Sequence, residues 1–166
     1  MKYFIDTEFI ESGPHKPIDL ISIGIVAEDG RELYAVSAEF NPQDANDWVK
    51  ANVLPHLGDA IPTSLDVMAV RVERFMYDGQ IPPEIWGYYA DYDWIVFCQI
   101  FGRMIDLPKG WPMFCNDIKQ LAMMMGNPKL PEQIDIEHNA LNDARWNKVA
   151  YDFLIDRTNY VIPKVK

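Results

Sequence analysis

Two acidic side chains lie two residues apart near the start of the chain, in the segment YFIDTEFIE (3–11). Because side chains alternate along a strand, Asp6 and Glu8 are expected to point to the same side. Two like charges at the end of an apolar strand repel each other unless a cation joins them. Hard divalent cations such as Mg²⁺ prefer oxygen ligands of this kind. The pair therefore suggests a metal site, and the alternative is a solvated strand end.

The spacing of two acids does not decide between these alternatives by itself. With 25 acidic residues in 166, about four such pairs are expected by chance, and the chain has three. The second pair, Asp91 and Asp93, begins an expected helix, where acids satisfy free N–H groups and complement the helix dipole. We assign helix capping to Asp91. Asp93 is either a surface acid on the first turn or a further ligand.

The segment EHNALNDARW (137–146) contains the sharpest combination of residue types, His138 followed by Asp143. Inside one helix these side chains would diverge by about 140°, so sharing a cleft requires His138 to precede the helix. A histidine at that junction can reach a bound water. The alternative is an exposed histidine near a helix cap, with Asp143 paired to Arg145 or Lys148.

The elements that would position these residues begin with three strands. They are expected at 2–5, 18–29 and 31–40, with a hairpin turn at Asp29-Gly30. A short helix is expected at 44–53. An amphipathic helix follows over 63–78, capped by Thr63 or Ser64. The chain therefore opens with an antiparallel meander.

The second half alternates strands and helices. A strand is expected at 84–90, a helix at 91–102, an extended piece at 113–115 and a helix at 117–126. A long helix runs from about Asn139 to 156, with Ala140, Ala144, Val149 and Phe153 on its apolar face. This order predicts an α/β fold, a mixed five-stranded sheet flanked by helices.

The composition indicates one domain over 1–166, ending in a polar, basic tail at about 158–166, because 49% of the residues are hydrophobic and no repeat is visible. The apolar runs are shorter than a membrane helix needs, and the N-terminus lacks a signal peptide's pattern. Cys98 and Cys115 show no zinc-binding spacing, which favours buried thiols and a soluble, cytoplasmic protein without membrane contact. A net charge of -10 argues against a broad basic surface for nucleic acid.

Taken in order, DTE (6–8), YDWIVF (92–97) and HNALNDA (138–144) resemble the three motifs of the DEDDh 3'-5' exonucleases, which have a ribonuclease H-like fold. The resemblance covers nearly the whole chain. It is closest to the mycobacterial-type 3'-5' exoribonuclease family, whose typical stretches are similar to YFIDTEFIE, LISIGIVAEDGRELYAVSAEF, VLPHL and CQIFG. Many relatives have a His-Asn pair where this chain has Tyr88-Tyr89.

The resemblance implies a site and an activity. Asp6, Glu8, Asp93 and Asp143 would hold two Mg²⁺ or Mn²⁺ ions, and His138 would act as general base. Two such ions, about 3.5–4 Å apart, activate a water and stabilise the leaving oxygen of a phosphodiester. The expected activity is hydrolysis from the 3' end of single-stranded RNA or a 3' overhang, releasing nucleoside 5'-monophosphates. A homodimer is expected from the resemblance alone.

The resemblance also implies which residues contact the substrate. Phe9 is expected to stack on the terminal bases, which is worth about 1–3 kcal/mol per base, and core packing is its alternative. Thr7 and Tyr92 are further substrate-binding candidates.

A DNA exonuclease with the same site stays open, because discrimination depends on 2'-OH contacts that the sequence does not locate. The alternative outside enzymes is a catalytically silent nucleic-acid-binding or interaction protein.

Overall fold

A mixed five-stranded sheet forms the centre of the computed structural model, which describes residues 1–79 and 81–161, with side chains up to residue 157. Strands β1 (Lys2–Glu11), β2 (Ile18–Ala27) and β3 (Glu32–Val36) form the antiparallel meander. Strands β4 (Glu84–Gly87) and β5 (Asn116–Asp117) add parallel to β1. The strand order is β3-β2-β1-β4-β5. The predicted mixed sheet with an opening meander is confirmed.

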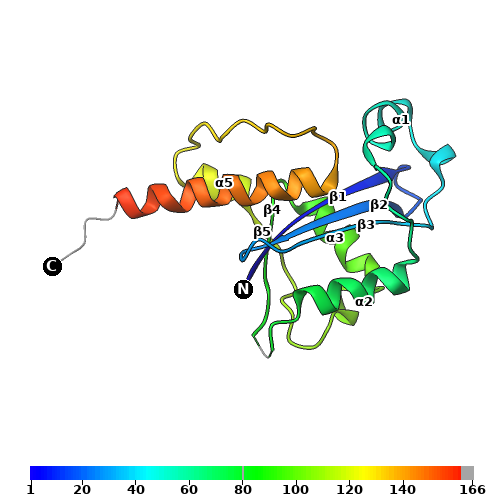
Figure 1. Ribbon diagram of the computed structural model, residues 1–166, viewed down its shortest axis with the longest axis horizontal. Helices are drawn as coiled ribbons and strands as arrows, with labels where there is room; N and C mark the ends of the chain where they lie inside the picture. Colours follow the sequence, from blue (N-terminus) through cyan, green and yellow to red (C-terminus); the bar gives the residue numbers. More distant parts are fainter. Residues whose placement is uncertain (80, 162–166) are drawn as a thin grey trace.

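Helices cover both faces of the sheet (Figure 1). Helices α2 (Leu65–Met76) and α3 (Asp91–Ile100) pack on one face, and α4 (Ile118–Met124) and the long α5 (Ala140–Val161) pack on the other. Helix α1 (Asp47–Asn52) packs through Val49 in a small cluster with Ile10 of β1 and Ile21 of β2. The described residues also contain the short 3-10 turns η1 (Pro42–Asp44), η2 (Leu54–His56) and η3 (Met104–Asp106). None of the described helices is long and apolar enough to cross a membrane.

Alternation along β1 decides which face receives the acids. Tyr3 and Ile5 belong to the core cluster under α2 and α3, whereas Phe4 belongs to the cluster under α5. Asp6 and Glu8 follow Phe4 at two-residue intervals, so their side chains point toward the α5 face. The apolar pattern of β1 thus directs both carboxylates toward the helix that carries the third motif.

The start of α5 lies unusually close to the sheet at Gly24 of β2. A Cβ at this position would lie 2.1 Å from the carbonyl oxygen of Ala140 and 2.5 Å from Cα of Leu141. Farther along α5, the buried side chain of Asn147 donates to the carbonyl of Ile5 in β1 at 2.8 Å. A glycine on β2 and a hydrogen bond to β1 therefore set the position of α5 over the strand that carries Asp6 and Glu8.

Several element boundaries differ from the prediction. Strand β1 continues to Glu11 because it pairs with β2 over its whole length. Strand β4 ends at Gly87, since the chain turns at Tyr89, whose φ is 54°. The extended piece expected at 113–115 is shifted to β5, which pairs with β4. Pairing with neighbouring strands set these ends.

Two predictions about helices are wrong. Asp91 does not cap α3, because Ala90 is the N-cap residue and makes no side-chain cap bond. Val149 is 51% exposed, because the close contact at Gly24 orients α5 so that Asn147, Ala150 and Leu154 continue the buried line from Ala140 and Ala144. The polar, basic tail expected at about 158–166 stays a prediction: the helical backbone continues to Val161, and residues 162–166 lie outside the described part.

Candidate active site

The β1 acids lie beside small residues of β2. Asp6 is paired with Gly24 and Glu8 with Ser22, and the register shifts by a bulge between Glu8 and Phe9. Small partners leave room above the sheet for the start of α5. The extra residue of the bulge is Ile21 of β2, because Glu8 pairs with Ser22 and Phe9 with Leu20. The alternation of β1 therefore continues, and Phe9 packs against the same core cluster as Tyr3 and Ile5.

Asp93 reaches the same region from the first turn of α3. Its Oδ1 accepts two hydrogen bonds from Thr7, one from the backbone N–H at 2.8 Å and one from the hydroxyl at 2.6 Å. Only 7% of Asp93 is exposed. Helix α3 begins immediately after the turn at Tyr89, which aims its first turn at the middle of β1. The carboxylate is therefore fixed through one oxygen, and the other oxygen stays available.

The third motif places His138 outside α5 and Asp143 within its first turn. His138 has a φ of 64°, in the left-handed region, and its backbone N–H donates to Oδ2 of Asp143 at 3.0 Å. Gln133 donates to Oδ1 of Asp143 at 2.5 Å. The prediction that His138 lies on the segment leading into the helix is confirmed. Neither Arg145 nor Lys148 pairs with Asp143, since Arg145 binds Glu32 and Lys148 binds Asp152.

The predicted residues meet at one place. Ligand atoms of Glu8, His138 and Asp143 all lie within 4.8 Å of one another. Asp6, Asp93 and Asp143 also interact electrostatically with one another and with Glu8. An open cavity of about 350 Å³ lies beside them and is lined by Asp6, Tyr88, Gln133, Glu137, His138, Asp143, Trp146 and Asn147. Asp6 of β1 and Asp143 of α5 thus line one cavity, and Glu8 of β1 and Asp93 of α3 lie near enough to interact electrostatically with both.

Burial raises the pKa values of all four carboxyl groups, and neighbouring negative charges add to the effect. For Asp6, burial and then the charges of Asp93, Asp143 and Glu8 raise the pKa well above its usual range. Burial, followed by Asp143 and Asp93, raises the pKa of Glu8 to about 8. Burial raises the pKa of Asp93 to about 6, although the hydrogen bonds from Thr7 act in the opposite direction.

The pKa of Asp143 is raised by burial and lowered in part by its bonds to Gln133 and His138. Among the described residues, no lysine or arginine forms an ion pair with any of these four acids. A cluster of carboxyl groups whose ionisation is opposed by burial and by their neighbours' charges, and which has no paired lysine or arginine among the described residues, is an environment that a divalent cation stabilises. The four carboxylates offer oxygen donors, which fit Mg²⁺ or Mn²⁺.

Sequence reasoning missed the partners of His138 and Asp143. The ring of Trp48 in α1 packs edge-on against the ring of His138, with centroids 4.8 Å apart and planes at 78°. Gln133 lies on the polar segment before the third motif, and Asn139 caps α5 by accepting from the N–H of Asn142 at 3.2 Å. No local pattern marks Trp48 or Gln133. Asn139 could have been found, because Asn before a helical stretch is a typical N-cap.

Thr7, Phe9 and Tyr92, the proposed substrate contacts, are not among the described residues that line the cavity. The ring of Phe9 stacks on that of Tyr92 with centroids 5.5 Å apart, and the Tyr92 hydroxyl donates to Glu11 at 3.3 Å. Phe9 is half-buried against the core, whereas 43% of Tyr92 is exposed. The side chain of Thr7 is buried and occupied by Asp93, so a contact between Thr7 and substrate stays a prediction.

The Tyr88-Tyr89 pair has an asymmetric arrangement. Tyr88 lines the cavity and packs edge-on against Trp146, with centroids 4.9 Å apart. Tyr89 is 63% exposed and holds the left-handed turn before α3. Tyr88 and Trp146 therefore present an aromatic wall to the cleft.

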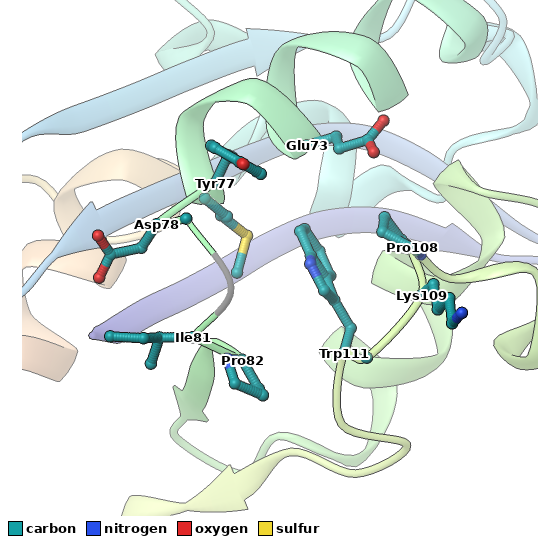
Figure 2. A pocket seen from close by; sticks show the side chains of 11 residues that line it. Glu73, Tyr77, Asp78, Ile81, Pro82, Pro108, Lys109 and Trp111 are labelled. Carbon is teal, nitrogen blue, oxygen red and sulfur yellow. The ribbon is translucent and has the colours of Figure 1, made fainter.

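A second hollow, of about 250 Å³, lies at the other end of β1 and is not part of this site. It is lined by side chains around Trp111, Tyr77 and Ile81 (Figure 2). Its charged residues are Glu73, Asp78 and Lys109, and it contains no histidine. It has neither the group of acids nor the base that the first cavity combines.

The chain matches the model of the Rv2179c-like 3'-5' exoribonuclease domain over residues 1–155. It belongs to this family. Two curated 3'-5' exoribonucleases from strains of Mycobacterium tuberculosis, one of them named Rv2179c, are each 44% identical over 149 residues, covering 87% of this chain and 88% of theirs. The predictions of the family and of an enzyme are confirmed.

Solved structures show the same fold. Escherichia coli exonuclease I in complex with an oligonucleotide aligns with a TM-score of 0.59 at 16% identity, covering 94% of this chain and 40% of that one. The ExoI/SSB-Ct complex aligns with a TM-score of 0.54 at 13% identity, covering 96% of this chain and 43% of that one. This chain spans less than half of those chains, so they support the ribonuclease H-like fold and no more.

Proposed function

We propose that this protein is a metal-dependent 3'-5' exoribonuclease of the DEDDh type, which releases nucleoside 5'-monophosphates from the 3' end of single-stranded RNA or a 3' overhang. The observation that carries the proposal is the convergence of Glu8, His138 and Asp143 within 4.8 Å in a member of an exoribonuclease family. Asp6 and Asp93 complete the set of acids around the same cleft.

Asp6, Glu8, Asp93 and Asp143 would hold the metal ions. Two Mg²⁺ or Mn²⁺ ions, when bound, supply activation of the attacking water and stabilise charge on the leaving oxygen. Thr7 holds Asp93 through one oxygen, which keeps the other free as a ligand. Asp143 is oriented through both of its oxygens, because Gln133 donates to Oδ1 and the His138 N–H donates to Oδ2.

His138 has the place and chemistry of a general base. Its ring is on the segment before α5, next to Glu8 and Asp143, and an imidazole can both accept and release a proton, as a general base must. An unprotonated ring nitrogen accepts the proton of the attacking water as the water oxygen bonds to phosphorus. The P–O3' bond then breaks, the terminal nucleotide leaves with a 5'-phosphate, and the new 3' oxygen takes a proton from solvent.

Aromatic side chains would hold the 3' end without a broad basic surface. Stacking on one aromatic ring is worth about 1–3 kcal/mol per base. Phe9 and Tyr92 form a stacked pair beside Glu8, and Tyr88 lines the cavity beside Asp6. This arrangement reconciles a net charge of -10 with a polyanionic substrate.

Digestion of matched RNA and DNA oligonucleotides tests the proposal. We expect a 5'-labelled RNA to shorten stepwise from its 3' end in Mg²⁺ or Mn²⁺, to survive in excess chelator, and to be degraded faster than the DNA of the same sequence. Equal or faster degradation of DNA would favour a DNA exonuclease. Purified protein that binds RNA and does not cleave it in either metal would favour a non-catalytic binding protein.

Oligomeric state and location are further parts of the proposal. We propose a homodimer on the basis of the family resemblance, and light scattering after size exclusion measures its mass. We also propose a cytoplasmic location. The free, buried thiol of Cys98 is compatible with a reducing compartment.

A further inference from the structure

The residue after the proposed base connects two parts of the chain that are distant in sequence. The side-chain oxygen of Asn139 accepts from the N–H of Asn142 at 3.2 Å and so caps α5. Its side-chain nitrogen donates to the carbonyl of His56 in η2 at 2.8 Å, across 83 residues of chain. Asn139 thus uses one end of its amide for the helix that carries Asp143 and the other end for the η2 turn.

The η2 turn is the continuation of the helix that contacts His138. Helix α1 ends at Asn52 and η2 starts at Leu54, so the two form one short unit. Trp48 in this unit places its ring edge-on against the ring of His138. A hydrogen bond from Asn139 to η2 therefore fixes, relative to α5, the surface on which the His138 ring rests.

His138 depends on such support because its own backbone is in an unfavourable conformation. A left-handed φ of 64° costs a non-glycine residue about 1 kcal/mol. Its backbone N–H is bonded to Asp143, but among the hydrogen bonds of the described residues none is made by its ring. Without the wall formed by α1 and η2, the ring would be free to leave the position it takes beside Glu8.

We propose that Asn139 is a positioning residue, which holds the ring of His138 in its catalytic position by joining η2 and α1 to the start of α5. The proposal rests on the proposed function, in which His138 is the base. It differs from helix capping, because capping requires only the side-chain oxygen of Asn139, whereas positioning also requires the nitrogen that reaches His56.

The substitution Asn139→Ser separates these two roles. Serine is as good an N-cap as asparagine, but its side chain is too short to reach the His56 carbonyl, and it adds no charge. We expect the melting temperature to stay near that of the wild type, kcat on an RNA oligonucleotide to fall about 10-fold or more, and KM to change less than twofold. Asn139→Ala should lose stability as well as kcat.

A double substitution tests whether Asn139 acts through His138. In the His138→Ala background, Asn139→Ser should lower kcat no further, because effects transmitted through one residue are not additive. Ser64→Ala, which removes the N-cap of the distant helix α2, is the control and should leave kcat unchanged. Unchanged kcat in Asn139→Ser, or an equal further loss in the double variant, would overturn the positioning role.

These outcomes differ from a failure of the proposed function. If the wild type does not shorten RNA, or if His138→Ala is as active as the wild type, the assignment of the base is wrong. If both behave as expected and Asn139→Ser keeps full kcat, only the role of Asn139 is wrong.

Discussion

Replacing Gly24 by alanine tests whether the distance between α5 and β1 sets the catalytic rate. The added Cβ would lie 2.1 Å from the carbonyl oxygen of Ala140, whereas Cβ contacts under 3.0 Å are essentially never seen. The backbone of α5 must therefore retreat by about 0.9 Å, the difference between these two distances. No flexible side chain can absorb the change, because the nearest atoms belong to the backbone of Ala140 and Leu141.

The retreat would move His138 and Asp143 away from Asp6 and Glu8. A misplacement of about 1 Å can cost on the order of 100-fold in rate, and an overpacked site costs about 1–3 kcal/mol of folding free energy. We expect kcat to fall about 100-fold and the melting temperature to fall on the order of 5 °C. Initial rates on 5'-labelled RNA and thermal unfolding followed by circular dichroism measure both effects.

Gly30→Ala is the matched control for this experiment. Gly30 has a φ of 90° in the β2–β3 turn, and a Cβ there meets no atom within 4 Å. Alanine at this position is strained, at a cost of about 1–2 kcal/mol, but it does not displace α5. We expect a lower melting temperature with unchanged kcat. A Gly24→Ala enzyme with wild-type kcat, or with a loss no larger than that of Gly30→Ala, would refute the reasoning.

Three other predictions concern the acids and the base. Asp143→Asn should abolish turnover in Mg²⁺ with the circular dichroism spectrum unchanged, and an active variant would contradict its role as a ligand. His138→Ala should lower kcat while Mn²⁺ binding measured by calorimetry is largely retained; loss of Mn²⁺ binding would instead make it a ligand. Because burial raises the pKa of Glu8 to about 8 and that of Asp93 to about 6, the folded protein binds more protons than the unfolded chain above pH 4.5. The free energy of unfolding of the metal-free protein therefore falls as pH rises from about 5 to 8. It is greatest at the lowest pH at which protonation of other groups does not unfold the protein. Saturating Mn²⁺ should remove this fall in melting temperature, and a metal-free stability that rises over the same range would contradict the shared acidic site.

The local sequence carried enough information to predict much of the catalytic arrangement. Alternation in β1 placed Asp6 and Glu8 on one side, since neighbouring apolar residues fix which face of a strand is buried. Helical geometry required His138 to precede α5, and the structure places it there. These predictions depended on periodicity and on the ends of elements, which are properties of short stretches of chain.

The sequence by itself determined the types of the proposed catalytic side chains, the order of their elements and that Asp6 and Glu8 share one side of β1. Only the tertiary structure decided which groups hold them in place. Thr7 binds Asp93 across 86 residues, and Asn139 binds His56 across 83. The contact of Gly24 with Ala140 likewise joins a strand to a helix from the opposite end of the chain. Such contacts depend on how closely whole elements pack, which is set by the shapes of both partners together and therefore cannot be predicted from either segment alone.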